Sequence, residues 1–534
     1  MTRHTHHISP LQARRLTYQP TVPKVLEDLN QLTFQNGEKT TAVKDAAEIN
    51  ARFPHTFGQS VVHAKIGGCR PKKVLRVGVV LSGGQAAGGH NVIAGLFDAL
   101  KAYHRESQLH GFLGGPSGII KGEAKQLAED EIARYRNLGG FDLIGSGRTK
   151  IETPEQFKQA LSETIKRRLD GIVVIGGDDS NTNAALLAEY FLAHDCAAKV
   201  IGVPKTIDGD LKNEFVEVSF GFDTACRTYA EMIGNIARDA LSAKKYVHFI
   251  KLMGRSASHI ALECALQTQA NLTWISEEVL ANKETLAHIV ADIVAFIRGR
   301  SKPYGVILIP EGLIEFIPEM KQLIAELNDL LPKLGAEREK VTAVAQALTQ
   351  SSRDVFSLLP EEIGRQLLLD RDPHGNVQVS HIQTEKLLSS LVNEQLSDVP
   401  FQPVHHFFGY EGRSALPSNF DATYCYALGR LAAALIHEGY TGYMSCIRHL
   451  TQSPAEWGVC GLPITSLMNM EQRSGKKKPV IQKALVDLRG ASFKMFAKHR
   501  ARWKKENHYR YPGPIQFEGD PTVTDQIPLS LVCR

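Results

Sequence analysis

The sequence has no long apolar run, no paired cysteine motif and little net charge, and each of these absences excludes a class of protein. None of its apolar stretches approaches the roughly 20 residues that a membrane-spanning helix needs. Its eight cysteines include no CxxC pair, which argues against a disulfide scaffold and a zinc site. The 62 basic and 57 acidic residues leave a net charge of +5, which does not indicate nucleic-acid binding. Residues 1–15 also lack the apolar core of a signal peptide, so we expect a soluble, cytoplasmic protein.

What the sequence does contain is a regular alternation of short apolar runs and helical patterns. The apolar runs are rich in Val and Ile and are typical of buried strands: 74–82, 141–146, 171–177, 198–204, 246–254 and 304–312. Between them lie helical patterns, for example 88–104, 119–138, 155–169 and 222–242. This alternation predicts an α/β fold with a parallel sheet that is covered on both faces. In such sheets ligands bind at the carboxyl ends of the strands.

Three segments lie outside this alternation. Residues 1–70 precede the first apolar run, and we interpret them as an N-terminal extension. Residues 315–400 are mostly helical in pattern and indicate an insertion. The C-terminal tail, residues 471–534, is weakly patterned, and its densest basic run, "SGKKKP" at 474–479, is more typical of a solvated loop than of a binding patch.

The first glycine-rich turn, "LSGGQAAGGHN" at 81–91, follows an apolar run and leads into a helical pattern. It matches neither GxxxxGKS/T nor GxGxxG, so the common nucleotide-binding fingerprints do not apply. The backbone N–H groups of Gly83 and Gly84 are candidates to contact an anion, but the turn is equally consistent with a plain strand–helix connection. A second turn, "GSGRTK" at 145–150, adds Arg148, which is either a phosphate ligand or, more commonly, a surface charge.

The turn "GGDDS" at 176–180 places two carboxylates where an anion would bind, and this needs an explanation. Mg²⁺ binds carboxylate oxygens together with phosphate oxygens, so we expect Asp178 to hold a magnesium ion that accompanies the phosphate. The same argument leaves Asp179 unexplained.

A fourth polar stretch, "GVPKTIDGDLKN" at 202–213, contains two further carboxylates. Asp208 and Asp210 flank a glycine, and either could accept a proton from a hydroxyl nucleophile, a role worth roughly 10²–10⁴ in rate. Downstream, Glu311 in "PEG" and Arg413 in "GYEGR" are candidates to hold a sugar hydroxyl group and a second phosphate. Each could be a surface charge, but the repeated position after an apolar run favours one shared site.

These motifs occur in the order expected of phosphofructokinases, and the sequence resembles the pyrophosphate-dependent, long-chain branch of that family over roughly residues 70–430. The resemblance is carried by "SGGQAAGGHN", "GGDDS", "PKTIDGD", "GFDTA", "MGR", "PEG" and "GYEGR". It implies two three-layer α/β domains with mostly parallel sheets and an active site in the cleft between them. We accordingly expect a pyrophosphate and magnesium domain over 71–240 and a fructose 6-phosphate domain over 241–470.

The resemblance also implies roles for individual residues. Asp208 would be the proton acceptor, Lys205, Arg148 and Asp179 would complete the catalytic set, and Asp178 would hold Mg²⁺. Substrate contacts would come from Gly83, Thr206, Ile207, Met253, Gly254, Arg255, Glu311, Tyr410, Glu411, Gly412 and Arg413. Lys245 and Tyr246 match the positions through which a neighbouring subunit reaches the sugar phosphate, which implies a homodimer or homotetramer. Tyr410 stands where ATP-using relatives commonly have His.

The resemblance offers an explanation for Asp179. ATP-using relatives read "GGDGS" and "PGTIDND", whereas this chain has Asp179 and Lys205 at the two variable positions. A carboxylate at 179 would face the α-phosphate of a nucleotide, and like charges about 4 Å apart repel by roughly 4 kcal/mol at an effective dielectric near 20. Pyrophosphate has no third phosphate, and Lys205 can neutralise charge on the transferring or leaving phosphate.

The expected reaction is reversible phosphoryl transfer from pyrophosphate to the 1-hydroxyl group of fructose 6-phosphate, which gives fructose 1,6-bisphosphate and phosphate. Two alternatives stay open: an ATP-dependent kinase of the same fold, and a non-catalytic regulatory subunit of such an enzyme. Asp179 and Lys205 argue against the first, and the presence of Asp178, Asp208 and Arg255 argues against the second. We expect neither nucleic acid nor a membrane among its partners.

Overall fold

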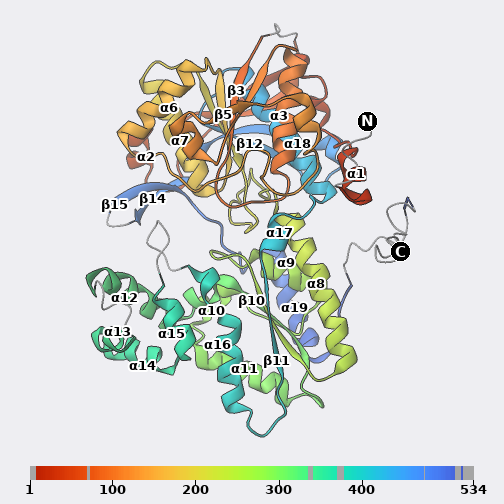
Figure 1. Cartoon of the computed structure of the whole chain (residues 1–534), viewed down its shortest axis with the longest axis vertical. Coiled ribbons are helices and arrows are strands. Elements are labelled where there is room, and N and C mark those ends of the chain that lie inside the picture. The colour runs from red at the N-terminus through yellow and green to blue at the C-terminus, as the bar shows by residue number, and fades with distance from the viewer. Residues whose placement is uncertain are drawn as a thin grey trace, which may run out of the picture.

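The computed structural model describes residues 8–68, 73–334, 341–369, 378–473, 476–511 and 519–520, which form two lobes stacked along the long axis of the molecule (Figure 1). The upper lobe in Figure 1 is built on a nine-stranded sheet. Its strands, in spatial order, are β1 (Leu32–Lys39), β2 (Ser60–Ile66), β13 (Gly458–Pro463), β12 (Tyr443–Arg448), β7 (Lys199–Pro204), β6 (Gly171–Gly176), β3 (Arg76–Leu81), β4 (Gln108–Phe112) and β5 (Ala124–Gln126).

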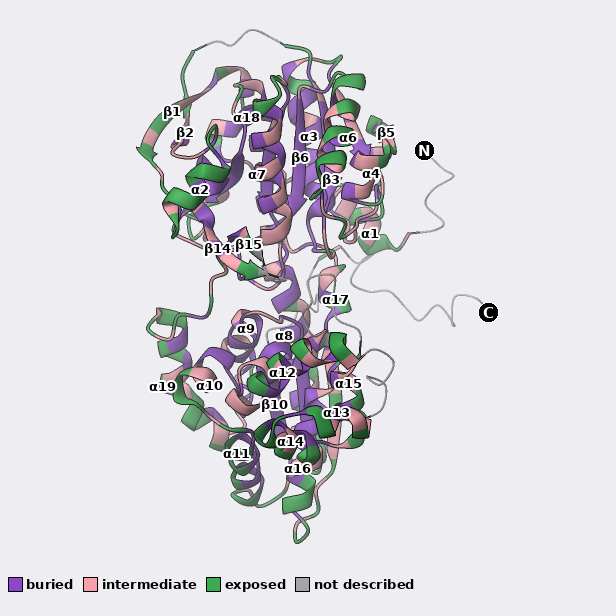
Figure 2. Cartoon of the chain, turned by 90° about the vertical axis from the view of Figure 1, so that its left-hand side faces the viewer, coloured by how far each residue is buried: buried purple, intermediate pink, exposed green. Residues whose placement is uncertain are grey.

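The central strands of this sheet, from β12 to β4, run parallel, and the outer strands on both sides pair antiparallel. Every residue of β6 is buried, as expected for a parallel strand that is covered on both faces. On one face pack α3 (Gly89–Tyr103) and α18 (Asn419–His437), and on the other α6 (Pro154–Lys166) and α7 (Asp178–Ala193). Figure 2 shows that the central strands of this sheet are buried beneath the helices.

The lower lobe contains a four-stranded parallel sheet with helices on both faces. Its strands, in spatial order, are β11 (Pro403–Phe408), β8 (Val247–Leu252), β10 (Gly305–Pro310) and β9 (Leu272–Thr273). Alternate side chains of β10 enter different cores, because successive residues of a strand point to opposite faces. Val306 and Leu308 pack with α8 (Phe222–Ala243) and α9 (His259–Thr268). Ile307 and Ile309 pack with the helices of the other face.

The remaining helices cover the edges and the outer faces of the two lobes. In the upper lobe these are α1 (Pro10–Leu16), α2 (Ala46–Arg52), α4 (Pro116–Lys121) and α5 (Glu129–Ala133). In the lower lobe they are α10 (Ser276–Asn282), α11 (Leu286–Arg298), α12 (Pro318–Leu334), α13 (Val341–Ala347), α14 (Gln350–Leu358), α15 (Glu361–Leu367), α16 (Thr384–Gln395) and α19 (Ala491–Lys505). The helices α12 to α16 confirm that the described part of 315–400 is mostly helical, and the two three-layer lobes confirm the predicted α/β fold.

The sheets divide the chain differently from the predicted ranges. Strands β1 and β2, from the predicted extension 1–70, join the upper sheet through β13. Strands β12 and β13 fall within 241–470 but belong to the upper sheet as well. The predicted tail after 470 contains the strand β15 (Lys476–Ile481) and the helix α19. Strand β15 pairs antiparallel with β14 (Met468–Arg473). Long-range strand pairing, which local patterns do not report, determines this division.

Two local predictions are wrong. Residues 141–146 form a turn, closed by the Gly145 N–H donating to the Phe141 carbonyl at 2.7 Å. Their apolar character arises because Phe141, Leu143 and Ile144 fill the upper core without forming a strand. The range 119–138, predicted as one helix, contains the end of α4 followed by β5 and α5, since Gly122 adopts a left-handed conformation that ends α4.

Candidate active site

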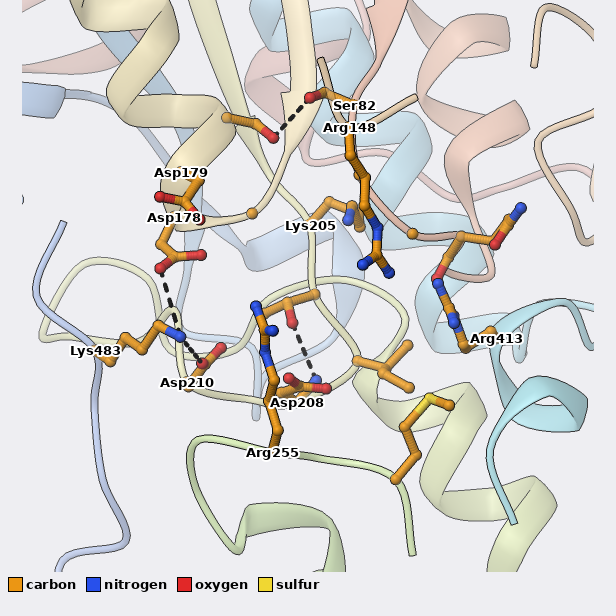
Figure 3. Close-up of a pocket in the computed structure, with 18 of the residues that line it drawn as sticks. Ser82, Arg148, Asp178, Asp179, Lys205, Asp208, Asp210, Arg255, Arg413 and Lys483 are labelled. Atoms are coloured by element: carbon orange, nitrogen blue, oxygen red, sulfur yellow. Dashed lines mark hydrogen bonds and ion pairs between the residues drawn. The ribbon is translucent and has the colours of Figure 1, made fainter. Parts of the chain in front are cut away.

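A cavity of about 260 Å³ is lined by residues of both lobes (Figure 3). The upper lobe contributes the turns that follow β3, β6 and β7, and the lower lobe contributes the turns that follow β8, β10 and β11. All six strands are parallel members of their sheets, so the cavity lies at the carboxyl ends where ligands bind in α/β folds.

Most of the predicted site residues line this cavity: Gly83, Arg148, Asp178, Asp179, Lys205, Thr206, Ile207, Asp208, Met253, Arg255, Glu311, Tyr410 and Arg413. Three others are their chain neighbours, Gly254, Glu411 and Gly412. Lys245 and Tyr246 do not line it, because they precede β8 at its opposite end.

Asp178 and Asp179 are the first two residues of α7, with Gly177 at the N-cap. The N-terminus of a helix carries partial positive charge and orphan N–H groups, which suits anions and stabilises these carboxylates. Each carboxylate also has a lysine partner: Asp179 Oδ1 lies 3.2 Å from Lys150 Nζ, and Asp178 Oδ2 lies 3.7 Å from Lys483 Nζ. The two carboxylates at the start of α7 are therefore each paired with an ammonium group.

The turn after β3 is held to its neighbours by hydrogen bonds. Ser180 Oγ donates to Ser82 Oγ at 2.8 Å, and the Gly83 N–H donates to the Gly147 carbonyl at 2.9 Å. This corrects the prediction that the Gly83 N–H contacts an anion, because the hydrogen bond to Gly147 already uses it. At Gly84, a Cβ atom would lie 1.8 Å from Arg413 Nη2, so only glycine allows the guanidinium to approach this turn.

Lys205 and Asp210 are buried charged groups with shifted pKa values. Burial, together with the nearby Arg413 charge, lowers the pKa of Lys205 to about 8. Burial and the neighbouring Asp208 carboxylate raise the pKa of Asp210 to about 7. Between the two aspartates, Gly209 has φ +73° and packs against Phe222, a left-handed conformation that favours glycine.

Glu311, the first residue after β10, presents a buried carboxylate to the cavity. Its Oε2 accepts the Gly254 N–H at 3.0 Å. Its Oε1 is buried and has no hydrogen-bond partner among the residues that the structure describes. Burial raises the pKa of this carboxyl group. An unpaired buried oxygen at the cavity wall is suited to accept a ligand hydroxyl group.

The turn after β11 forms the short helix α17 (Tyr410–Arg413). Glu411 Oε2 accepts the Gly409 N–H at 2.8 Å, and Gly412 packs closely on the ring of Tyr229. Arg413 reaches across to the upper lobe, where its Nε donates to the Gln85 carbonyl at 3.4 Å (Figure 3). Tyr410 remains 65% exposed.

Sequence reasoning missed three contributions to the cavity. Lys150 lies in a quoted turn but carried no motif signal. Gln378 and Val379 come from the helical insertion. Lys483 comes from the segment after β15, in the range predicted to be an uninformative tail. No local pattern identifies Lys483, because only the β14–β15 hairpin and the chain crossing between the lobes bring it to the site.

Within the described ranges, no group of three or more His, Cys, Asp and Glu side chains could hold a metal ion by itself. A Mg²⁺ ion needs fewer protein ligands, since one or two carboxylates plus phosphate oxygens and water suffice. Asp178, a carboxylate that faces the cavity, fits this requirement. Among the helices that the structure describes, none is long and apolar enough to cross a membrane.

The sequence profile of the family described as "Phosphofructokinase" matches residues 76–436. The "Pyrophosphate--fructose 6-phosphate 1-phosphotransferase" of Treponema pallidum is 54% identical, with 97% of this chain and 96% of that protein covered. The "Pyrophosphate--fructose 6-phosphate 1-phosphotransferase subunit beta" of Solanum tuberosum is 52% identical, with 96% and 92% covered.

Among solved structures, the "Pyrophosphate-dependent phosphofructokinase" of Nitrosospira multiformis superposes with a TM-score of 0.55. The match covers 81% of this chain and 93% of that one at 15% sequence identity. At this identity the likeness supports the fold alone.

Proposed function

This chain belongs to the phosphofructokinase family, and we propose that its cavity transfers a phosphoryl group reversibly between pyrophosphate and the 1-hydroxyl group of fructose 6-phosphate. The observation that carries this proposal is the full-length similarity to proteins named for this reaction. The arrangement of Asp208, Lys205 and Asp178 around one cavity supports it. The products are fructose 1,6-bisphosphate and inorganic phosphate.

A direct test follows the products by ³¹P NMR. Purified protein with Mg²⁺, pyrophosphate and fructose 6-phosphate should convert the pyrophosphate signal into equal amounts of inorganic phosphate and sugar 1-phosphate. Without the sugar phosphate, the pyrophosphate signal should persist. Pyrophosphate hydrolysis at the same rate without the sugar would contradict transfer and indicate a hydrolase.

The donor binds on the upper-lobe side of the cavity in our proposal. The N-terminus of α7 and the side chains of Lys205 and Arg148 surround the space where its phosphates would lie. Phosphoryl transfer depends on positioning and on neutralising charge at the equatorial and leaving oxygens, which these cations supply. Asp178 would hold a Mg²⁺ ion, which when bound neutralises charge on the donor oxygens.

The acceptor binds on the lower-lobe side. Glu311, Arg255 and Arg413 are proposed to hold the sugar hydroxyl groups and the 6-phosphate, since arginine matches phosphate oxygens as a fork. Asp208 takes the proton from the 1-hydroxyl group as that oxygen attacks the donor. The hydrogen bond from its own N–H to Thr206 Oγ1, at 3.1 Å, holds the turn that carries this carboxylate.

The two alternatives make different demands on these residues. An ATP-dependent kinase needs room and charge compatibility for an α-phosphate beside Asp179, and this carboxylate opposes both. A regulatory subunit has no need of Asp178, Asp208 and Arg255 together, and all three line one cavity here. The catalytic, pyrophosphate-dependent function is therefore the one that the site supports best.

The lowered pKa of Lys205 predicts an alkaline limit to donor use. Because Lys205 loses its proton as pH rises through about 8, kcat/KM for pyrophosphate should fall above this pH. Lys205→Arg keeps the charge to higher pH. The pH above which kcat/KM for pyrophosphate falls should therefore rise by at least about one pH unit in this variant. Both proteins are assayed with pyrophosphate, so a difference between their pH profiles arises from the side chain at position 205. If the two pH profiles superimpose, the loss of kcat/KM at alkaline pH is due to another group.

We also propose that Lys245 and Tyr246 complete the sugar-phosphate site of a second copy of this chain. They precede the six residues of β8, so they lie roughly 20 Å from the cavity of their own chain. Lys245 is exposed, and its Nζ lies 4.7 Å from the centroid of the Tyr246 ring.

Dilution to monomers should therefore raise the KM for fructose 6-phosphate or abolish activity. The double variant Lys245→Ala/Tyr246→Ala should raise this KM at any concentration, and Lys244→Ala is the matched exposed control. Sedimentation under assay conditions identifies the species. Fully active monomers would refute the shared site.

A further inference from the structure

Lys483 enters the cavity from the segment after β15, which is not one of the polar turns predicted to form the site. It follows β15 and projects toward Asp178 and Asp210 (Figure 3). Its Nζ lies 3.7 Å from Asp178 Oδ2 and 3.8 Å from Asp210 Oδ2, and it donates to Ser256 Oγ at 2.8 Å. This ammonium group thus joins two upper-lobe carboxylates to a lower-lobe hydroxyl group.

The backbone around Lys483 is fixed to both lobes. The Ala484 N–H donates to the Asp210 carbonyl at 2.7 Å, and His259 Nε2 donates to the Ala484 carbonyl at 2.9 Å. Two residues further on, the Val486 N–H donates to Glu277 Oε1 at 2.9 Å. These bonds leave the long side chain as the part of Lys483 that can change position.

The contact between Lys483 and Asp178 conflicts with a metal ion at the same carboxylate. An ammonium group and a divalent cation that share one carboxylate repel each other, because little water screens them in a half-buried cavity. Both side chains are mostly shielded, with 29% of Lys483 and 21% of Asp178 exposed. A metal ion at Asp178 would therefore weaken the attraction of this carboxylate for the ammonium group.

We propose that Lys483 exchanges partners during the catalytic cycle: it neutralises Asp178 in the free enzyme and moves to the phosphate oxygens of the donor when a divalent cation takes this carboxylate. The proposal rests on the assignment of Asp178 as the metal carboxylate in the proposed function. It gives Lys483 two effects, since it weakens metal binding to the empty site and strengthens binding of the donor.

The test measures Mn²⁺ binding to the full-length protein without substrates, by the electron paramagnetic resonance signal of the free ion. Lys483→Met should bind Mn²⁺ about tenfold more tightly than wild type, because an adjacent competing charge is gone. Lys483→Arg keeps the charge and should bind as wild type does. Lys478→Met removes the same charge from the same hairpin, where Lys478 pairs with Glu152 at 3.4 Å outside the cavity. It should leave the affinity unchanged.

A second measurement follows the donor side. With Mg²⁺ present, the inhibition constant of methylenediphosphonate, a pyrophosphate analogue that cannot be cleaved, should rise about tenfold in Lys483→Met. An unchanged inhibition constant would overturn the move to the donor. An unchanged Mn²⁺ affinity would overturn the competition at Asp178.

The variant Asp178→Asn separates the inference from its premise. If it weakens Mn²⁺ binding while Lys483→Met does not strengthen it, the metal assignment stands and the exchange is wrong. If Asp178→Asn leaves Mn²⁺ affinity unchanged in both the wild-type and the Lys483→Met background, the assignment of Asp178 fails and the exchange fails with it. Circular dichroism of each variant establishes that the loss of side chain has not unfolded the protein.

Discussion

Replacing Asp208 by alanine should lower the turnover number with pyrophosphate by at least about two orders of magnitude. The 1-hydroxyl group of the sugar must lose its proton as it attacks, and Asp208 is the proposed acceptor at the carboxyl end of β7. The KM for fructose 6-phosphate should change much less, because Glu311, Arg255 and Arg413 hold the sugar. Initial rates over a matrix of both substrate concentrations give the two parameters separately.

Asp210 provides the matched control for this prediction. It carries the same side chain two positions away but is buried, and it is bonded to the Lys483 segment through its backbone carbonyl. Asp210→Asn should keep more activity than Asp208→Asn. If Asp208→Ala retains more than a tenth of wild-type turnover and Asp210→Asn does not, the proton acceptor is Asp210.

Asp179→Gly should make ATP use detectable and should lower activity with pyrophosphate. The substitution removes the carboxylate and the bulk that oppose the α-phosphate of a nucleotide. Without a neighbouring positive charge, the repulsion between the two negative charges amounts to roughly 4 kcal/mol at 4 Å and an effective dielectric near 20. The ion pair with Lys150 at 3.2 Å offsets part of it in the folded protein, so the steric contribution of the side chain carries more of the exclusion.

The ion pair between Lys150 and Asp179 also affects the expected gain in ATP use. Asp179→Gly removes one partner of Lys150, and this ammonium group can then attract the nucleotide phosphates. Lys150→Met in the Asp179→Gly background should therefore reverse part of the gain in kcat/KM for ATP. Lys166→Met, which removes an exposed upper-lobe lysine paired with Glu163, is the control for the loss of one positive charge.

Lys205→Gly should mainly slow turnover with pyrophosphate and leave the exclusion of ATP largely intact. Combined with Asp179→Gly, it should shift the ratio of kcat/KM for ATP to that for pyrophosphate by more than either change alone. The two effects should not simply add, because both side chains face one small anion and neighbouring sites couple. A donor ratio that Asp179→Gly leaves unchanged within about threefold would contradict the exclusion argument.

The sequence predicted the parts of the site that lie next to buried strands. The runs 171–177 and 198–204 became β6 and β7, and the polar turns after them meet at one edge of the sheet because the strands are parallel. The run 141–146 was wrongly predicted to be a strand, because the apolar side chains of a turn can fill the core just as those of a strand do.

Interactions between distant segments could not be predicted. Lys483 reaches Asp178 only because the β14–β15 hairpin packs near α7 and the chain then crosses to the lower lobe, as Figure 1 shows. The hydrogen bond that occupies the Gly83 N–H likewise depends on Gly147, a residue of a separate turn. Neither partner is marked by a local motif.

The central claim is that pyrophosphate, and not ATP, is the phosphoryl donor. The most direct measurement is a coupled assay for fructose 1,6-bisphosphate on the purified protein, with Mg²⁺ and fructose 6-phosphate fixed and each donor supplied separately. We expect kcat/KM for pyrophosphate to exceed that for ATP by at least about a hundredfold, as a penalty of roughly 3 kcal/mol requires. Equal or greater kcat/KM with ATP would contradict the account.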